Sequence, residues 1–193
     1  MVLPCLLAFT LVACAPRTLR LENQVLRLEN ADLRRELDET RKNALPADYA
    51  RTVDMGVVRD FTTRAGFTEI DDSQPGVLLI PVEGANTQFR LLIQLFDKEK
   101  VLYLAVTDYM RIEDAPDPRS MVVLLTQMAT INYDLLLGKL QLNPKSGAIT
   151  LSVELNLDDG LGFETFKVVA RHLVRTADDR YPDLRAAFQG GGI

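Results

Sequence analysis

Histidine, cysteine and tryptophan are nearly absent from this chain, whose 193 residues include one histidine, two cysteines and no tryptophan. A single histidine leaves one base for a hydrolase triad, and so few cysteine and histidine residues cannot build a zinc cluster. An excess of positive charge is also missing, because the formal net charge is −5 at pH 7. An acidic chain argues against general binding of nucleic acid, so we predict no nucleic-acid partner.

The chain nevertheless contains enough apolar sequence for a folded domain. Hydrophobic residues make up 47% of it and charged residues 25%, which excludes both wholesale disorder and a polytopic membrane protein. No glycine-rich phosphate loop joins a predicted strand to a helix, and no acidic run has the spacing of a calcium loop. We therefore predict a protein that is not an enzyme and that binds neither a metal nor a cofactor.

The N-terminal segment Met1–Ala13 is uncharged, and it is apolar apart from Pro4 and Thr10. It is too short to cross a bilayer as a stable helix, but it matches the apolar core of a secretory signal peptide. The segment ends in Leu11-Val12-Ala13-Cys14, which resembles the lipobox of bacterial lipoproteins. This resemblance implies that Cys14 is lipidated, becomes the mature N-terminus and anchors the protein in the cell envelope, at the outer membrane or the periplasmic face.

The positively charged start of a signal peptide is missing, since the first basic residue is Arg17. A start codon upstream of Met1 would account for this. The alternative is that the segment is a buried apolar part of a cytoplasmic protein. Cleavage before Cys14 would remove Cys5 and leave one cysteine, so an oxidising compartment would form no intrachain disulfide.

A seven-residue repeat follows, because Leu-Arg-Leu-Glu-Asn occurs at 19–23 and again at 26–30. Such a repeat in a stretch without glycine or proline predicts coiled-coil heptads. The predicted interface residues, alternating between the d and a positions, are Leu19, Asn23, Leu26, Asn30, Leu33 and Leu37. The flanking g and e positions hold Glu22, Glu29 and Glu36, and Arg20, Arg27 and Arg34.

Glutamate at the g positions, arginine at the e positions and asparagine at two a positions together predict a parallel homodimer of this stalk. In a parallel pair each g glutamate meets an e arginine on the partner, whereas antiparallel pairing sets like charges together. Asparagine at a costs stability but favours two strands in register. The alternative is a lone solvated helix, because three heptads with polar core positions are marginal in solution. A second apolar stripe at Leu21, Val25 and Leu28 has no assigned role.

Residues 47–188 are predicted to form one α+β domain with an antiparallel sheet flanked by helices. The helices are expected at 46–65, 119–136 and 163–180. In the first of them apolar residues recur every four positions, beginning with Tyr49 and Val53. The strands are expected at 67–71, 77–82, 89–95, 101–109, 140–142 and 149–156. Hairpins without a strand–helix–strand alternation favour this class. The remaining boundaries are a signal peptide at 1–13, a lipid-anchored tether at 14–18, the stalk at 19–42, a hinge at 43–46 and a tail at 189–193.

The third and fourth predicted strands carry apolar residues on both faces. Leu92 and Phe96 lie opposite Leu91 and Leu95 in the first of them. One face of the sheet should pack on helices, and the other should meet a further helix, a second subunit or a ligand, because a large exposed apolar patch is usually a binding site. His172 is expected at the surface or its boundary, and the pairs Asp71-Asp72, Asp158-Asp159 and Asp178-Asp179 in solvated turns or at a helix end.

The second half of the chain resembles a known family. The residues that carry the resemblance are Asn132–Leu142, the turn at Gly147, Val153-Glu154-Leu155 and Ala177–Pro182. They are similar to the YbjN family, which is associated with sensory transduction and shares the fold of type III secretion chaperones. The resemblance implies a non-enzymatic, often dimeric module that binds a protein or peptide. The alternative function is a cytoplasmic, type III secretion chaperone-like or regulatory protein with a misread N-terminus.

Charge reversal in the stalk tests the parallel register. Replacing Glu22 and Glu29 by lysine sets them against Arg27 and Arg34 of the partner, so we expect a weaker dimer, more so at low salt than at high salt. Replacing Asn23 and Asn30 by isoleucine should instead raise thermal stability and loosen the preference for two strands. Analytical ultracentrifugation of residues 17–45 measures both effects, and an unchanged dimer at low salt after charge reversal would contradict the register.

Overall fold

The computed structural model describes residues 27, 31, 34–35, 48–112 and 117–189. The chain divides into two units, Met1–Ala47 and Asp48–Ile193. In the first unit Arg27, Ala31, Arg34 and Arg35 are helical and exposed. The predicted lipidation residue and coiled-coil interface lie outside the described residues: Cys14, Leu19, Asn23, Leu26, Asn30, Leu33 and Leu37.

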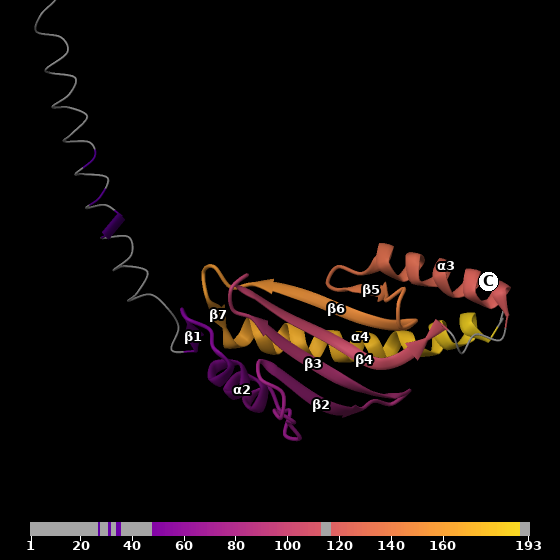
Figure 1. The fold of residues 1–193 in the computed structure, drawn as a ribbon, viewed down its shortest axis with the longest axis horizontal. Helices are drawn as coiled ribbons and strands as arrows, with labels where there is room; N and C mark the ends of the chain where they lie inside the picture. The colour runs from indigo at the N-terminus through magenta and orange to yellow at the C-terminus, as the bar shows by residue number, and fades with distance from the viewer. Residues whose placement is uncertain (1–26, 28–30, 32–33, 36–47, 113–116, 190–193) are drawn as a thin grey trace, which may run out of the picture. The chain divides into compact units, whose positions relative to one another are not determined.

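The second unit is built on a five-stranded antiparallel sheet with the strand order β2-β3-β4-β6-β5 (Figure 1). Its strands are β2 (Val77–Glu83), β3 (Gln88–Phe96), β4 (Val101–Arg111), β5 (Lys139–Leu142) and β6 (Ala148–Asn156). The helices are α2 (Met55–Arg64), α3 (Pro118–Asp134) and α4 (Phe163–Phe188), and the short strands β1 (Tyr49–Ala50) and β7 (Leu161–Gly162) pair with each other. The α+β class with an antiparallel sheet flanked by helices is confirmed.

The core lies between one face of the sheet and α4, which runs behind the sheet in Figure 1. Successive strand residues point to opposite faces, so every second residue of β3 enters the core. Leu91 and Ile93 are fully buried there, and their register partners Val106 and Leu104 of β4 are buried beside them. Phe166 of α4 covers this layer from the helix side. The period-two pattern therefore correctly predicted the inward residues.

The first helix, α2, begins at Met55, whereas the spacing of apolar residues predicted a start at Pro46. Asp54 is its N-cap, and the Asp54 side chain accepts a hydrogen bond from the backbone N–H of Val57 at 2.9 Å. Tyr49 instead lies in β1, where it pairs with Gly162, and its hydroxyl donates to the carbonyl of Asp159. A strong cap at Asp54 and the pairing of β1 with β7 outweigh the four-residue spacing that extended the predicted helix back to Pro46.

The last helix continues through Pro182 to Phe188, whereas the prediction ended it at Arg180. A proline inside a helix removes one hydrogen bond and costs free energy. Here Leu184 and Ala187 lie beyond it and are buried on the core face of α4. Burial of this last segment offsets the cost of the proline. Asp178 and Asp179 consequently lie inside α4 and not at its end.

One strand prediction also needs correction. The strand expected at 67–71 is reduced to a single bridge between Asp71 and Leu79. Ser152 of β6 lies on the face of the sheet opposite the core, in the same row as Leu92, and is nevertheless fully buried. Its hydroxyl donates to the Oε1 atom of Gln141 at 3.0 Å, so a neighbouring strand satisfies the polar group that an alternating pattern assigns to water.

Asp178 fastens the β2–β3 hairpin to α4. Its carboxylate accepts three backbone N–H hydrogen bonds from the loop that joins the two strands. The donors are Ala85 at 2.9 Å, Asn86 at 2.8 Å and Thr87 at 3.2 Å. Gly84 is required at this point, because a Cβ atom there would collide with the carboxylate of Asp178 and lie 2.9 Å from the carbonyl oxygen of Thr87.

The pKa of Asp178 lies below the ordinary value of an aspartate. Desolvation is the largest single influence and raises this pKa, but the hydrogen bonds from Asn86, Ala85 and Thr87 together outweigh it. A lowered pKa means that the folded state prefers the carboxylate. Its contribution to stability is complete above the unfolded-state pKa of about 3.9 and is lost as the pH falls through the folded-state value.

Replacing Asp178 by asparagine should lower the free energy of unfolding by about 1–2 kcal/mol at pH 7, because charge-assisted hydrogen bonds are lost. Chemical denaturation at pH 7 and at pH 3 measures the difference from the unmodified protein, which should shrink at the lower pH. The matched control is Asp179→Asn, which alters the exposed neighbouring carboxylate. Equal effects of the two substitutions would show that Asp178 is not the fastening residue.

Candidate functional site

The face of the sheet opposite α4 is the candidate functional site, and we call it the outer face. The described helices pack elsewhere: α4 contacts β4 and β6 from the core side, α3 contacts α4 and β5, and α2 contacts α4. In Figure 1 the sheet lies in front of α4. Within residues 48–112 and 117–189, no helix covers the outer face.

On the outer face, residues that are paired between neighbouring strands form rows that run across the sheet. One row joins Leu79, Leu92, Ala105 and Ser152 across β2, β3, β4 and β6. The next row joins Val77, Gln94, Tyr103 and Glu154, and the row at the end of β3 joins Phe96 and Val101. The centre of the outer face is therefore mainly apolar. The expectation that β3 and β4 carry apolar residues on both faces matches this arrangement, in which Leu92, Phe96, Val101 and Tyr103 share one face.

A groove of about 350 Å³ opens at the end of this apolar region. Its lining consists of Phe96, Glu99, Val101, Tyr103 and Glu154. The rings of Phe96 and Tyr103 meet edge to face with centroids 6.5 Å apart, which fixes both walls. Phe96 is 37% exposed although it is a large aromatic residue. The alternation of residues in the predicted strands indicated that this face is apolar. The groove itself depends on how β3, β4 and β6 are aligned, and only the structure shows that alignment.

Two carboxylates border the groove, and sequence analysis did not single them out as site residues. Glu99 belongs to the turn between β3 and β4, and Glu154 projects from β6. Lys139 of β5 lies 3.7 Å from Glu154, in an exposed pair that holds the lysine only weakly. Arg90 and Asp108 form a second ion pair farther along the outer face. The groove therefore combines two aromatic walls with two acidic side chains at its border, one of which is paired with Lys139.

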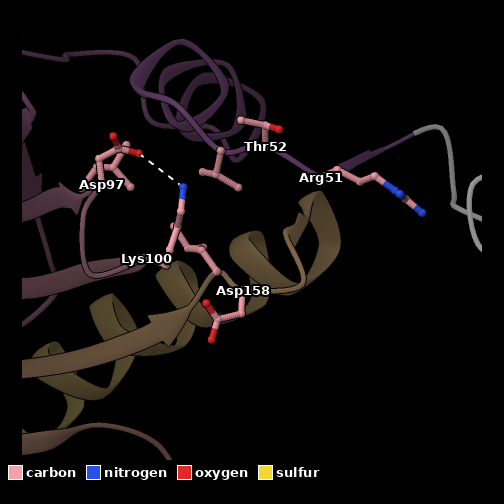
Figure 2. Close-up of a pocket in the computed structure, with 8 residues that line it drawn as sticks. Arg51, Thr52, Asp97, Lys100 and Asp158 are labelled. Carbon is pink, nitrogen blue, oxygen red and sulfur yellow. Dashed lines mark ion pairs between the residues drawn. The ribbon is translucent and has the colours of Figure 1, made fainter. Parts of the chain in front are cut away.

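A second pocket, of about 170 Å³, lies where the segment before α2 meets two turns (Figure 2). Lys100 points into it and forms an ion pair with Asp97 at 3.7 Å. The carbonyl of Lys100 also accepts a hydrogen bond from the backbone N–H of Leu157 at 2.8 Å, which joins the β3–β4 turn to the end of β6. Asp158 and Thr52 complete the polar lining. These contacts hold the two turns together, so the polar groups in this pocket have a structural role.

In the part of the chain that the structure describes, no three histidine, cysteine or acidic side chains lie close enough to hold a metal ion. His172 is half-buried, and its Nε2 atom lies 3.3 Å from the hydroxyl oxygen of Thr176. Burial raises the pKa of Tyr109, whose hydroxyl donates to the carbonyl of Ala177 at 2.5 Å. Among these same residues, no helix is long and apolar enough to cross a membrane.

Comparison with solved structures shows which fold this chain shares. The crystal structure of YbjN from E. coli is 15% identical, and the match covers 72% of this chain and 95% of that one with a TM-score of 0.54. This likeness shows a shared fold. No curated protein matches the sequence of this chain.

Two solved complexes show a weaker likeness. The match to the HopA1–SchA chaperone–effector complex has 18% identity, covers 67% of this chain and 98% of that one, and has a TM-score of 0.46. The match to the ExsC–ExsE complex has 15% identity, covers 65% and 88% of the two chains, and has a TM-score of 0.45.

The sequence model of the YbjN family, described as "Putative bacterial sensory transduction regulator", matches residues 54–186. That range begins at the N-cap of α2 and ends within the last turn of α4. It therefore includes the five-stranded sheet and the whole outer face. The chain belongs to the YbjN family.

Proposed function

We propose that this protein is a non-enzymatic, lipid-anchored envelope protein whose YbjN domain binds a protein or peptide through its outer face. The observation that carries the proposal is the groove beside Phe96 on a sheet face that no described helix covers. A partly exposed aromatic residue in a concave apolar site is a typical anchor for a partner side chain. Hydrophobic contact of this kind requires no catalytic group.

Charge indicates the kind of partner that the groove prefers. Glu99 and Glu154 stand at the border of an otherwise apolar surface, and Lys139 pairs with Glu154 across an exposed 3.7 Å contact. We expect these two carboxylates to attract a basic side chain. The complementary ligand is a segment with an aromatic or branched apolar anchor next to lysine or arginine. The net charge of −5 for the chain favours the approach of such a basic segment.

Anchoring through Cys14 rests on the lipobox Leu11–Cys14 and the uncharged apolar run before it. The heptads at 19–42 would then hold two copies side by side at the membrane, where tethering raises their effective concentration and imposes parallel pairing. The alternative function is a cytoplasmic, type III secretion chaperone-like or regulatory protein that starts elsewhere. Both functions use the same outer face.

Photo-crosslinking tests the binding surface in intact cells. A crosslinking amino acid at Tyr103 should give discrete adducts, because this side chain lines the groove. The matched control carries the same amino acid at Val168, which is 60% exposed on α4. The double variant Glu99→Lys/Glu154→Lys should strongly reduce the Tyr103 adducts, because it reverses the charge that a basic segment would meet. Equal adducts from Tyr103 and Val168, or adducts insensitive to charge reversal, would refute the proposed site.

Lipidation is tested separately. The Cys14→Ala variant should take up no radioactive palmitate, and it should remain as an unprocessed precursor or leave the membrane fraction. Labelling, mass and fractionation are compared with Cys5→Ala, which changes the cysteine that cleavage would remove. If Cys14→Ala fractionates with membranes at the mass of the unmodified protein, the chain is not a lipoprotein, and the outer-face proposal then applies to the cytoplasmic alternative.

A further inference from the structure

A third pocket, of about 330 Å³, lies where the end of α2, the end of β2 and the middle of α4 meet. Its volume is near the lower end of the range for small-molecule sites in proteins. The lining combines three apolar side chains with two arginines. These residues are Phe67, Val82, Val174, Arg171 and Arg175. We call this hollow the α4 pocket.

The end of α2 holds Arg171 in place. The Nε and Nη2 atoms of Arg171 donate hydrogen bonds to the carbonyl oxygen of Ala65, at 3.1 and 2.9 Å. Ala65 is the C-cap of α2, so the guanidinium is fixed at the negative end of that helix. Within the described residues, the Nη1 atom of Arg171 takes part in no hydrogen bond or ion pair. An edge of the guanidinium therefore remains for a ligand.

Arg175 follows Arg171 by one helical turn. Residues four positions apart are neighbours on a helix surface, and like charges at that spacing destabilise the helix. Among the described residues, no carboxylate forms an ion pair with either arginine. Arg175 also lines a neighbouring hollow that contains Asp134 and Asp179, but neither aspartate lies within ion-pair distance of it. An anion bound between the two arginines would relieve their repulsion.

The two acidic residues of the lining, Glu83 and Asp178, do not neutralise these arginines. The carboxylate of Asp178 is already engaged by the backbone N–H groups of the β2–β3 loop. Glu83 ends β2, in which successive side chains point to opposite faces of the sheet. Val82 pairs with the buried Phe89 on the core side, so the side chain of Glu83 points to the outer face. The positive charge of the arginines therefore faces the pocket.

The apolar part of the α4 pocket is rigid. Phe67, Val82 and Val174 are partly buried and pack against the core, so only part of each side chain borders the hollow. Gly66 lies beside them with a φ of 96°, a conformation that favours glycine. A Cβ atom at Gly66 would lie 3.4 Å from the Nη2 atom of Arg171. The absence of a side chain there leaves room around the guanidinium.

We propose that the α4 pocket binds a small organic carboxylate that carries an apolar group. The carboxylate lies between Arg171 and Arg175, because arginine N–H groups pair with carboxylate oxygens in charge-assisted hydrogen bonds. The apolar group lies against the three apolar side chains and is removed from water there. A neutral apolar compound or a small anion satisfies only half of this lining, so each binds more weakly than a compound that has both parts.

This inference goes beyond the proposed function and does not rest on it. The α4 pocket lies on the side of the sheet that α4 covers, and it shares no lining residue with the groove beside Phe96. A small ligand in the α4 pocket and a partner on the outer face can therefore be bound at the same time. Loss of either interaction leaves the other unchanged, so the two proposals fail separately.

Titration of the full chain with phenylacetate tests the α4 pocket. Nuclear magnetic resonance of the isotope-labelled protein follows the backbone amide signals of Gly66 and Gly84, which both line the pocket. We expect these signals to shift and saturate with phenylacetate. Phenylethanol, which lacks the charge, and acetate, which lacks the ring, should each bind at least about tenfold more weakly. Absence of saturable shifts, equal binding of phenylethanol, or tighter binding of inorganic phosphate would overturn the proposal.

A substitution then assigns the binding to the arginines. Arg175→Gln should raise the dissociation constant for phenylacetate about tenfold or more, because it removes charge-assisted hydrogen bonds. Arg175→Lys keeps the charge without the planar guanidinium and should give an intermediate value. The matched control is Arg185→Gln, which changes an exposed arginine of the same helix outside the pocket. Thermal unfolding checks that all three variants are folded, and equal affinities of Arg175→Gln and Arg185→Gln would refute the assignment.

Discussion

A single long helix covers one face of the sheet, and the rest of the domain depends on this one-sided packing. α4 holds Phe166 and Leu173 against the inward residues of the strands, and α2 joins it through aromatic contacts between Phe61 and Phe163. The fastening of the β2–β3 hairpin by Asp178 comes from the same helix. Because packing is concentrated on this side, the outer face of the sheet is available for binding while the core remains complete. The residues that hold the fold together and those of the proposed binding surface therefore lie on opposite faces of the sheet.

The groove beside Phe96 has the chemistry of a docking site. Phe96 and Tyr103 meet edge to face in its lining, and Glu99 and Glu154 stand at its border. An aromatic surface next to acidic side chains suits a basic segment that carries an apolar anchor.

Much of the sheet followed from the sequence, because alternation of apolar and polar residues has a direct physical meaning in β3 and β6. Errors arose where a long-range contact outweighed a local signal. Tyr49 pairs with Gly162 and does not lie in the predicted helix, and α4 continues past Pro182 because Leu184 beyond it is buried. The apolar part of the outer face was predictable from Leu92 and Phe96. The bordering Glu99 and Glu154 were not, because the register of β3, β4 and β6 brings them together. The predicted lipidation and coiled-coil residues stay predictions.

The central claim is that a partner occupies the outer face in the cell, and thiol accessibility tests it most directly. A Val101→Cys variant places a reporter in the groove, and Val168→Cys places one on α4 as a reference. Maleimide labelling rates are compared between intact cells and the purified protein. Occupancy of the groove predicts that the cysteine at position 101 is labelled much more slowly in cells, while the one at position 168 is labelled at similar rates in both. If both positions are labelled equally in cells and after purification, the outer face is empty and the claim is wrong.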